Sequence, residues 1–181
     1  MTRFRPLMFT AALAAALFAA RPALAGPPLL CFPFDIGAAR SLPMGTGSWR
    51  ATDPRYDVGH LVDDTVALLT PDAPIVVRME TLRRATIYAA TEPAVADRLL
   101  QTLQARAAER TAHAPLAVFD FGYLVETYRQ GKFMFSTPVA ALDRIDGYQL
   151  VLKAQAISQN DDMARAAQLI AGTAPAHTAF K

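Results

Sequence analysis

Residues 91–111 read TEPAVADRLLQTLQARAAERT, and this stretch decides the fold class. Its apolar residues recur at every fourth position, as Val95, Leu99, Leu103 and Ala107. Residues at this spacing share one face of an α-helix, and the charged residues between them take the opposite face. Pro93, just after Thr91, is well suited to the first turn of a helix, where no N–H is needed. The stretch therefore predicts an amphipathic helix that buries one face.

The same pattern recurs on both sides of this helix. Capping residues and prolines open the apolar runs, and glycine or proline closes them. Asp53-Pro54 opens the first run, Asp72 with Pro74 opens the second, and Gly131 closes the fourth. The expected helices are 54–70, 72–90, 91–111, 116–130, a region from Thr137 that Asp146-Gly147 divides into a short and a longer helix, and 160–170 before Gly172.

These helices are arranged in pairs. Asp53, Thr91 and Thr137 each open a helix that a partner helix follows after a short turn, and these starts lie 38 and 46 residues apart. Over residues 53–172 the arrangement resembles the tetratricopeptide-like right-handed stack of helical hairpins. That resemblance implies stacked hairpins with a continuous core. A compact bundle of the same helices is the alternative, and both predict an all-α fold.

The first 25 residues are typical of a cleavable export signal. Arg3 and Arg5 give a positive start, residues 7–20 are apolar, and Ala23-Leu24-Ala25 is a small-x-small cleavage site. We therefore expect the mature chain to start at Gly26 and to work in the periplasm or outside the cell, with no stable membrane anchor. The alternative, a retained anchor, is disfavoured because a membrane-spanning helix needs about 20 apolar residues.

Charge argues against nucleic acid as a partner. The chain has 18 basic and 16 acidic residues, but Arg3, Arg5 and Arg21 lie in the signal, so 15 basic residues remain and the net charge becomes −1. No cluster of basic residues remains to neutralise phosphates, the main source of affinity for nucleic acids. We expect no nucleic-acid binding.

The segment 26–52 is rich in proline and glycine and also carries many apolar side chains. It is expected to form an ordered arm that packs on the helical domain 53–172, whereas residues 173–181 form a flexible tail. The single cysteine, Cys31, cannot form an internal disulfide. Because it lies in an apolar run, we expect it to be buried; an intermolecular bridge is the alternative.

The first predicted helix carries a weak metal-site candidate. His60, Asp63 and Asp64 are spaced to share one helix face, with Asp57 one turn earlier. Imidazole and carboxylate groups at this spacing can bind a divalent metal if another element supplies a further ligand. A solvated or salt-bridged acidic face is the favoured interpretation, and we expect no metal or other cofactor.

The second predicted helix has a dense polar side made of Arg78, Glu80, Arg83 and Arg84. Glu80 is placed to pair with Arg83 and Arg84 within the helix. Because the first two helices should run antiparallel, Asp63 or Asp64 is expected to reach these arginines. Such a network would set the helix register, or alternatively clamp a carboxylate or phosphate.

The fourth predicted helix contains Asp120 among aromatic residues, followed by Gly122, Tyr123 and Glu126. An unpaired buried carboxylate is costly, so Asp120 is expected either to pair with a hydroxyl or an arginine, or to face a groove. Gly122 inside a helix indicates close approach by another element, for which the arm is the candidate.

No catalytic motif is present: the sequence lacks GxSxG, HExxH, CxxC and a glycine-rich phosphate loop. We therefore favour a non-catalytic exported domain that binds a protein or peptide, with oligomerisation open. The alternative is a small exported enzyme or ligand-binding protein that uses a carboxylate/arginine pocket, and a ligand-free structural protein of the cell envelope is a third. The candidate binding residues are Asp63, Asp64, Arg78, Glu80, Arg83, Arg84, Asp120, Tyr123 and Glu126.

Overall fold

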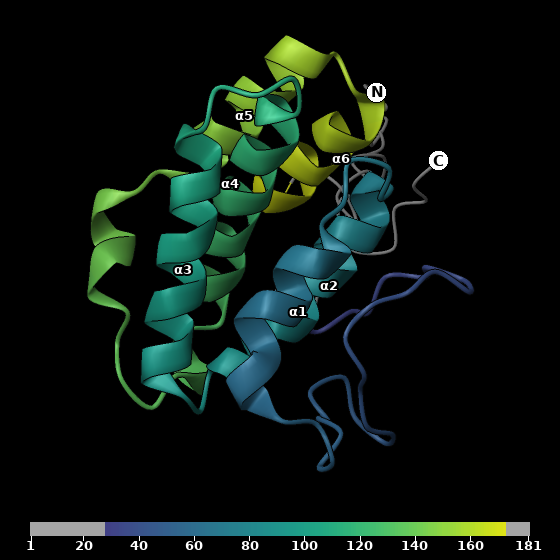
Figure 1. Cartoon of the computed structure of the whole chain (residues 1–181), viewed down its shortest axis with the longest axis vertical. Coiled ribbons are helices and arrows are strands. Elements are labelled where there is room, and N and C mark those ends of the chain that lie inside the picture. The colour runs from purple at the N-terminus through teal and green to yellow at the C-terminus, as the bar shows by residue number, and fades with distance from the viewer. Residues whose placement is uncertain (1–27, 173–181) are drawn as a thin grey trace, which may run out of the picture.

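The computed structural model describes residues 28–172, and these residues form helices and connecting segments without a strand (Figure 1). The all-α prediction is confirmed. The proposed signal peptide, residues 1–25, and the tail, 173–181, lie outside the described residues. The α-helices are α1 Leu61–Leu68, α2 Ile75–Ala89, α3 Pro93–Ala108, α4 Ala114–Gln130, α5 Gly147–Ser158 and α6 Asp161–Ile170, and the short 3₁₀ helices are η2 Val58–His60, η3 Lys132–Met134 and η4 Ala140–Arg144.

Helix α2 is the centre of the fold. It contacts α1, α3, α4 and α6, and the arm lies along it. Of its 15 residues, 13 are buried, so it is a core helix with no solvent face. The contact between α2 and α6 joins the first hairpin to the third, which is consistent with a compact bundle.

The predicted hairpin partners pack together, as α1 with α2, α3 with α4, and α5 with α6, but α4 packs most extensively on α5. A Cβ added to Gly122 would lie 2.7 Å from the Gly147 carbonyl oxygen and 2.8 Å from the Leu150 Cβ. Because Gly122 has no side chain, the backbones of α4 and α5 can come into contact. The expectation that the arm approaches Gly122 is therefore wrong, and α5 takes that place.

The predicted helix start at Asp53 is wrong. The Asp53 carboxylate accepts from the backbone N–H of Arg55 and so makes a local turn; Asp57 instead caps η2, after which α1 begins. The competing turn chemistry of aspartate explains this error.

Asp72 and Thr91 do not cap their helices either, because α2 begins after Pro74 and α3 after Glu92. The predicted division at Asp146-Gly147 is confirmed, because the short 3₁₀ helix η4 is followed by the longer α5, which the Asp146 side chain caps. The predicted α6 cap is confirmed, because Asn160 accepts from two backbone N–H groups.

The arm, described over residues 28–52, packs on the bundle beside α1 and α2, as expected (Figure 1). The side chains of Leu29, Leu30 and Leu42, which belong to the arm, are buried. Cys31 is only half-buried, contrary to the expectation, because its two leucine neighbours take the inward positions. Burial raises the pKa of its thiol, and Arg83 opposes that shift. Within residues 28–172, no helix is long and apolar enough to cross a membrane.

Candidate functional site

The predicted polar residues do not converge on one pocket. The structure distributes six of them over three separate, largely buried groups on α2 and α4. We call these the arm cluster (Glu80, Arg83 and Arg84), the Arg78–Asp120 pair and the Glu126–Arg129 pair.

The arm cluster is centred on Glu80, whose carboxylate is fully buried. Its Oε2 accepts from the backbone N–H of Phe34 at 3.0 Å and from Arg83 Nε at 2.7 Å. Its Oε1 accepts from Arg83 Nη2 at 2.8 Å and from Arg84 Nε at 2.7 Å. The predicted pairing of Glu80 with both arginines is confirmed, and each carboxylate oxygen has two donors.

The same arginines hold the arm. Arg83 Nη1 donates to the carbonyls of Leu30 at 3.0 Å and Trp49 at 2.9 Å, and Arg84 Nη1 donates to the carbonyl of Leu42 at 2.6 Å. These carbonyls belong to an irregular segment without helical partners, so a buried guanidinium satisfies them. The arm cluster therefore fastens the arm to α2.

The Arg78–Asp120 pair joins α2 to α4. Arg78 Nη1 donates to Asp120 Oδ2 at 2.6 Å, and the rest of the guanidinium donates to the carbonyls of Thr70 and Ala73. The expected arginine partner of Asp120 is confirmed. Burial raises the Asp120 pKa to about 6, while Arg78 acts in the opposite direction. Asp120 Oδ1 has no hydrogen-bond partner among the described residues.

The Glu126–Arg129 pair fixes the segment that leads into α5. Glu126 Oε1 accepts from Arg129 Nη1 at 3.0 Å and from the backbone N–H of Tyr148 at 3.1 Å. Arg129 Nη2 also donates to the carbonyls of Leu142 and Ile145. Burial raises the pKa of Glu126.

Tyr123 is buried in the core rather than available to a ligand. Its ring stacks on Phe119 with centroids 5.7 Å apart, and its hydroxyl has no hydrogen-bond partner among the described residues. Burial raises the pKa of this hydroxyl, and the charge of Glu80 adds to the shift.

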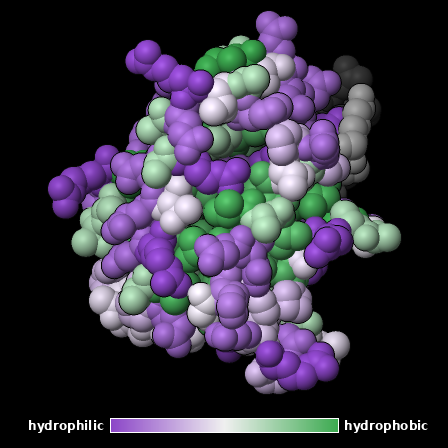
Figure 2. Space-filling view, in the orientation of Figure 1, coloured by the Kyte–Doolittle hydropathy of each residue, from purple (hydrophilic) through white to green (hydrophobic). Residues whose placement is uncertain are grey.

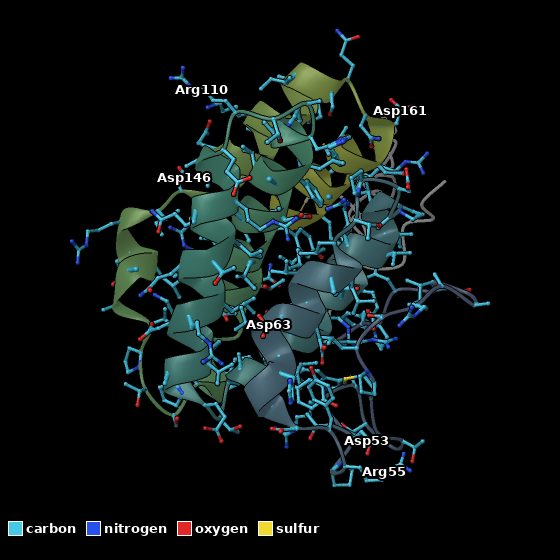
Figure 3. The ribbon with its side chains drawn as sticks, viewed as in Figure 1. Asp53, Arg55, Asp63, Arg110, Asp146 and Asp161 are labelled. Atoms are coloured by element: carbon cyan, nitrogen blue, oxygen red, sulfur yellow. The ribbon has the colours of Figure 1, made fainter. Side chains whose placement is uncertain are left out.

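The metal-site candidate on α1 is not assembled. Among residues 28–172, no three His, Cys, Asp or Glu side chains are grouped to hold a metal ion. His60 Nε2 lies 3.6 Å from Asp57, and Asp64 accepts from the Tyr56 hydroxyl at 2.7 Å. Asp63 is exposed part-way along α1 (Figure 3). Neither Asp63 nor Asp64 pairs with an arginine of α2, so the expectation that they reach these arginines is wrong. Arg78 forms its ion pair with Asp120 instead.

A cleft of about 500 Å³ lies at the end of the molecule where Asp53 and Arg55 meet, close to the start of α1 (Figure 3). Tyr56 and Tyr88 form one wall, with ring centroids 4.8 Å apart. Their hydroxyls are engaged with Asp64 and with the backbone of the arm. Tyr88 is only 3% exposed, so the half-buried Tyr56 supplies most of the tyrosine surface in the cleft. We call this the aromatic cleft; its lining residues are Arg50, Thr52, Asp53, Pro54, Tyr56, Val58, Ile87, Tyr88, Ala90, Thr91, Phe133 and Met134.

Phe133 borders the aromatic cleft with 63% of its surface exposed. A second hollow of about 270 Å³, lined by Phe135 and Val139 among others, lies along the same segment. Figure 2 shows that hydrophobic side chains also gather over the region of α1 and α2 on an otherwise largely hydrophilic face. The sequence prediction missed the cleft, although the apolar run Phe133-Met134-Phe135 inside an expected loop was a signal.

Comparisons of the chain with protein-family models, curated proteins and solved structures find no match. The tetratricopeptide-like resemblance stays a prediction.

Proposed function

We propose that this protein is an exported, non-catalytic helical domain that binds an apolar side chain of a protein or peptide partner in the aromatic cleft. The observation that carries the proposal is Phe133, a large apolar residue exposed beside a cleft walled by Tyr56 and Tyr88. Aromatic residues in concave, partly polar surfaces are characteristic of protein-binding sites.

The polar residues of the aromatic cleft are also suited to bind the backbone of a peptide. Arg50 is exposed and lines the cleft, so its guanidinium can donate to a peptide carbonyl, while Tyr56 and Phe133 supply apolar contact. The carboxylate oxygens of Asp53 already accept from Arg55. The volume of about 500 Å³ is large enough for a bulky apolar side chain together with its neighbours. The expected partner segment therefore carries an aromatic or branched aliphatic residue.

The non-catalytic part of the proposal is supported by how the charged residues are used. The side chains of Glu80, Arg83 and Arg84 form their hydrogen bonds with one another and with backbone groups of the arm. Catalytic acids and bases need access to a substrate. None of these three groups lines the aromatic cleft.

A displayed library of random peptides, selected on the purified protein, tests the binding site. Phe133→Ser is the test variant, and Ile157→Ser is the matched control because Ile157 is exposed to a similar extent, 60% against 63%, but lies on α5. We expect enriched peptides to share an apolar anchor, to bind at least tenfold more weakly to Phe133→Ser and to bind Ile157→Ser normally. No enrichment, or equal binding to both variants, would contradict the proposal.

Export rests on residues 1–25 and has its own test. The protein is expressed in a Gram-negative host with and without these residues, and cell fractions are compared. We expect the full chain to reach the periplasm and its purified form to begin at Gly26 by mass spectrometry. A cytoplasmic, uncleaved product would overturn the export proposal without affecting the binding site.

A further inference from the structure

The aromatic cleft carries one charged side chain without a partner in the part of the chain that the structure describes. Of the residues that line the cleft, only Arg50 and Asp53 are charged. The Asp53 carboxylate is engaged by Arg55, whose Nε and Nη2 donate to its two oxygens at 3.1 and 2.9 Å (Figure 3). These bonds lower the pKa of Asp53 to about 2, so the pair stays ionised. The Arg50 guanidinium forms no hydrogen bond or ion pair within residues 28–172.

No second acid lines the cleft to neutralise Arg50. Asp57 and Glu92 are sequence neighbours of lining residues, but neither is itself a lining residue. The Asp57 carboxylate accepts from the backbone N–H of Gly59 and lies 3.6 Å from His60 Nε2. Because the Asp53–Arg55 pair is neutral as a unit, the remaining positive charge of the cleft is that of Arg50.

The same cleft offers an apolar seat. Phe133 is 63% exposed, and the half-buried side chains of Tyr56, Val58 and Met134 also line the cleft. A cation and an apolar surface in one concave site favour a ligand that carries an anion close to an apolar group. The volume of about 500 Å³ lies within the usual range of ligand pockets, so the cleft accommodates a short end of a chain.

We propose that the aromatic cleft binds the C-terminus of a partner protein, with the last side chain, an apolar one, against Phe133 and Tyr56, and the α-carboxylate on the Arg50 guanidinium. This inference rests on the peptide-binding function proposed above and names the part of the peptide that is bound. A carboxylate matches the parallel donors of a guanidinium and is a stronger acceptor than a neutral carbonyl. Capture of a terminal carboxylate is an established mode of peptide recognition.

An acidic side chain inside a peptide fits the cleft less well than a terminal carboxylate. In an extended peptide, neighbouring side chains point to opposite sides, so an acid and the apolar residue beside it do not enter one cleft together. The α-carboxylate and the side chain of a last residue leave the same Cα atom. Both groups therefore reach Arg50 and the apolar seat from a single residue.

Four short acetylated peptides test this requirement on the purified protein. Ac-Gly-Gly-Phe with a free C-terminus carries both groups, and its C-terminal amide lacks the carboxylate. Ac-Gly-Gly-Ala with a free C-terminus lacks the large apolar side chain. Ac-Asp-Gly-Phe amide has the same net charge as the first peptide but carries it on an internal side chain.

Binding is followed by amide chemical shifts in ¹H–¹⁵N correlation spectra. We expect the free acid ending in Phe to give saturable shifts around residues 50–58, 87–91 and 133–134. It should bind about fivefold more tightly than either amide, an effect limited by the exposure of Arg50 to solvent. The acid ending in Ala should bind at least about tenfold more weakly, because it buries less apolar surface.

Two substitutions separate the two contacts. Arg50→Gln is expected to weaken the free acid about fivefold, to the level of its amide, and to leave the amide unchanged. Phe133→Ser should weaken the acid and the amide alike. Arg40→Gln is the matched control for Arg50→Gln, because Arg40 is exposed on the same arm but does not line the aromatic cleft. At an ionic strength of about 1 M, the preference for the acid should shrink, because charges are then screened beyond about 3 Å.

The outcomes separate this inference from the function on which it rests. Equal binding of the free acid and its amide, equal binding of the internal acid, or a preference that survives Arg50→Gln would overturn C-terminal recognition and leave peptide binding in the cleft intact. Absence of saturable shifts with the free acid would also overturn the inference. The peptide-binding function falls with it only if the displayed library yields no enrichment either.

Discussion

Two buried ionic groups share helix α2 and differ in how completely they are satisfied. In the arm cluster, Glu80 has four donors, and Arg83 and Arg84 divide their remaining hydrogen bonds among backbone carbonyls of the arm. In the Arg78–Asp120 pair, the arginine is satisfied but one oxygen of Asp120 is not. Both groups are buried, so burial alone does not show whether a carboxylate is fully satisfied.

The difference lies in what surrounds each carboxylate. Glu80 is covered by the arm, which contributes the N–H of Phe34 as a donor. Asp120 is covered by other residues that leave its Oδ1 inaccessible and without a hydrogen-bond partner among the described residues. A completed network helps to make the fold specific, whereas an incomplete one carries the cost of an unpaired buried polar atom. Each prediction below tests one side of this comparison.

Deletion of residues 28–50 should have the largest effect, because it removes the structure that completes the arm cluster. Leu29, Leu30, Phe34 and Leu42 are buried, and their loss alone amounts to about 6 kcal/mol or more. Since a domain of this size is stable by only about 5–15 kcal/mol, we expect cooperative unfolding to disappear in calorimetry. An unchanged melting temperature would show that the arm is not part of the folded unit.

Glu80→Gln should be the most damaging single substitution. It leaves Arg83, which is 1% exposed, buried without a counter-charge, and breaking such a pair costs about 3–5 kcal/mol. The free energy of unfolding in urea measures this loss. Glu92→Gln, at an exposed position, is the control and should change stability by less than about 0.5 kcal/mol. Equal effects of the two variants would argue against the structural role of the arm cluster.

Most of the fold could be predicted from local patterns. The apolar stripe over residues 93–107 and the caps at Asn160 and Gly131 depend only on residues within one or two helical turns. The sequence alone therefore predicts them. The start of α1 was misplaced because Asp53 is compatible both with a helix cap and with the turn that it forms with Arg55. The sequence does not reveal which one tertiary packing selects.

The candidate sites were less predictable, because they depend on contacts between distant segments. The pairing of Glu80 with Arg83 and Arg84 follows from helical spacing, but their bonds to Leu30 and Leu42 span roughly fifty and forty residues. The choice of Asp120 over Asp63 as partner of Arg78 depends on which helix covers α2. The aromatic cleft likewise combines the arm, α2 and η3, so no single stretch of sequence indicates it.

The incomplete pair predicts a dependence of stability on pH. The pKa of Asp120 is about 6 in the folded protein against an ordinary value of 3.8, so the folded state binds this proton more tightly. This contribution to stability is fully present below pH 3.8 and is lost as pH rises through about 6. The change amounts to about 3 kcal/mol.

Asp120→Asn isolates this effect, since an asparagine does not titrate. Urea denaturation of both proteins between pH 4 and 8 should show wild type losing about 3 kcal/mol relative to the variant as pH rises. At pH 7 the variant leaves Arg78, which is 1% exposed, without its counter-charge, so we still expect it to be less stable than wild type, as with Glu80→Gln. A pH-independent difference between the two proteins would mean that Asp120 is as well satisfied as Glu80.

Arg84→Gln should have the smallest effect and distinguishes the members of the arm cluster from one another. The Arg84 side chain is 20% exposed, whereas that of Arg83 is 2% exposed, so water can replace part of its bonding. Its loss leaves Glu80 paired with Arg83 and removes the donor to the Leu42 carbonyl. We expect the free energy of unfolding to fall by about 1 kcal/mol. Hydrogen exchange should show faster opening of the arm around residues 41–44, with no change around 29–34. A loss as large as that of Glu80→Gln would mean that both arginines are equally essential to the cluster.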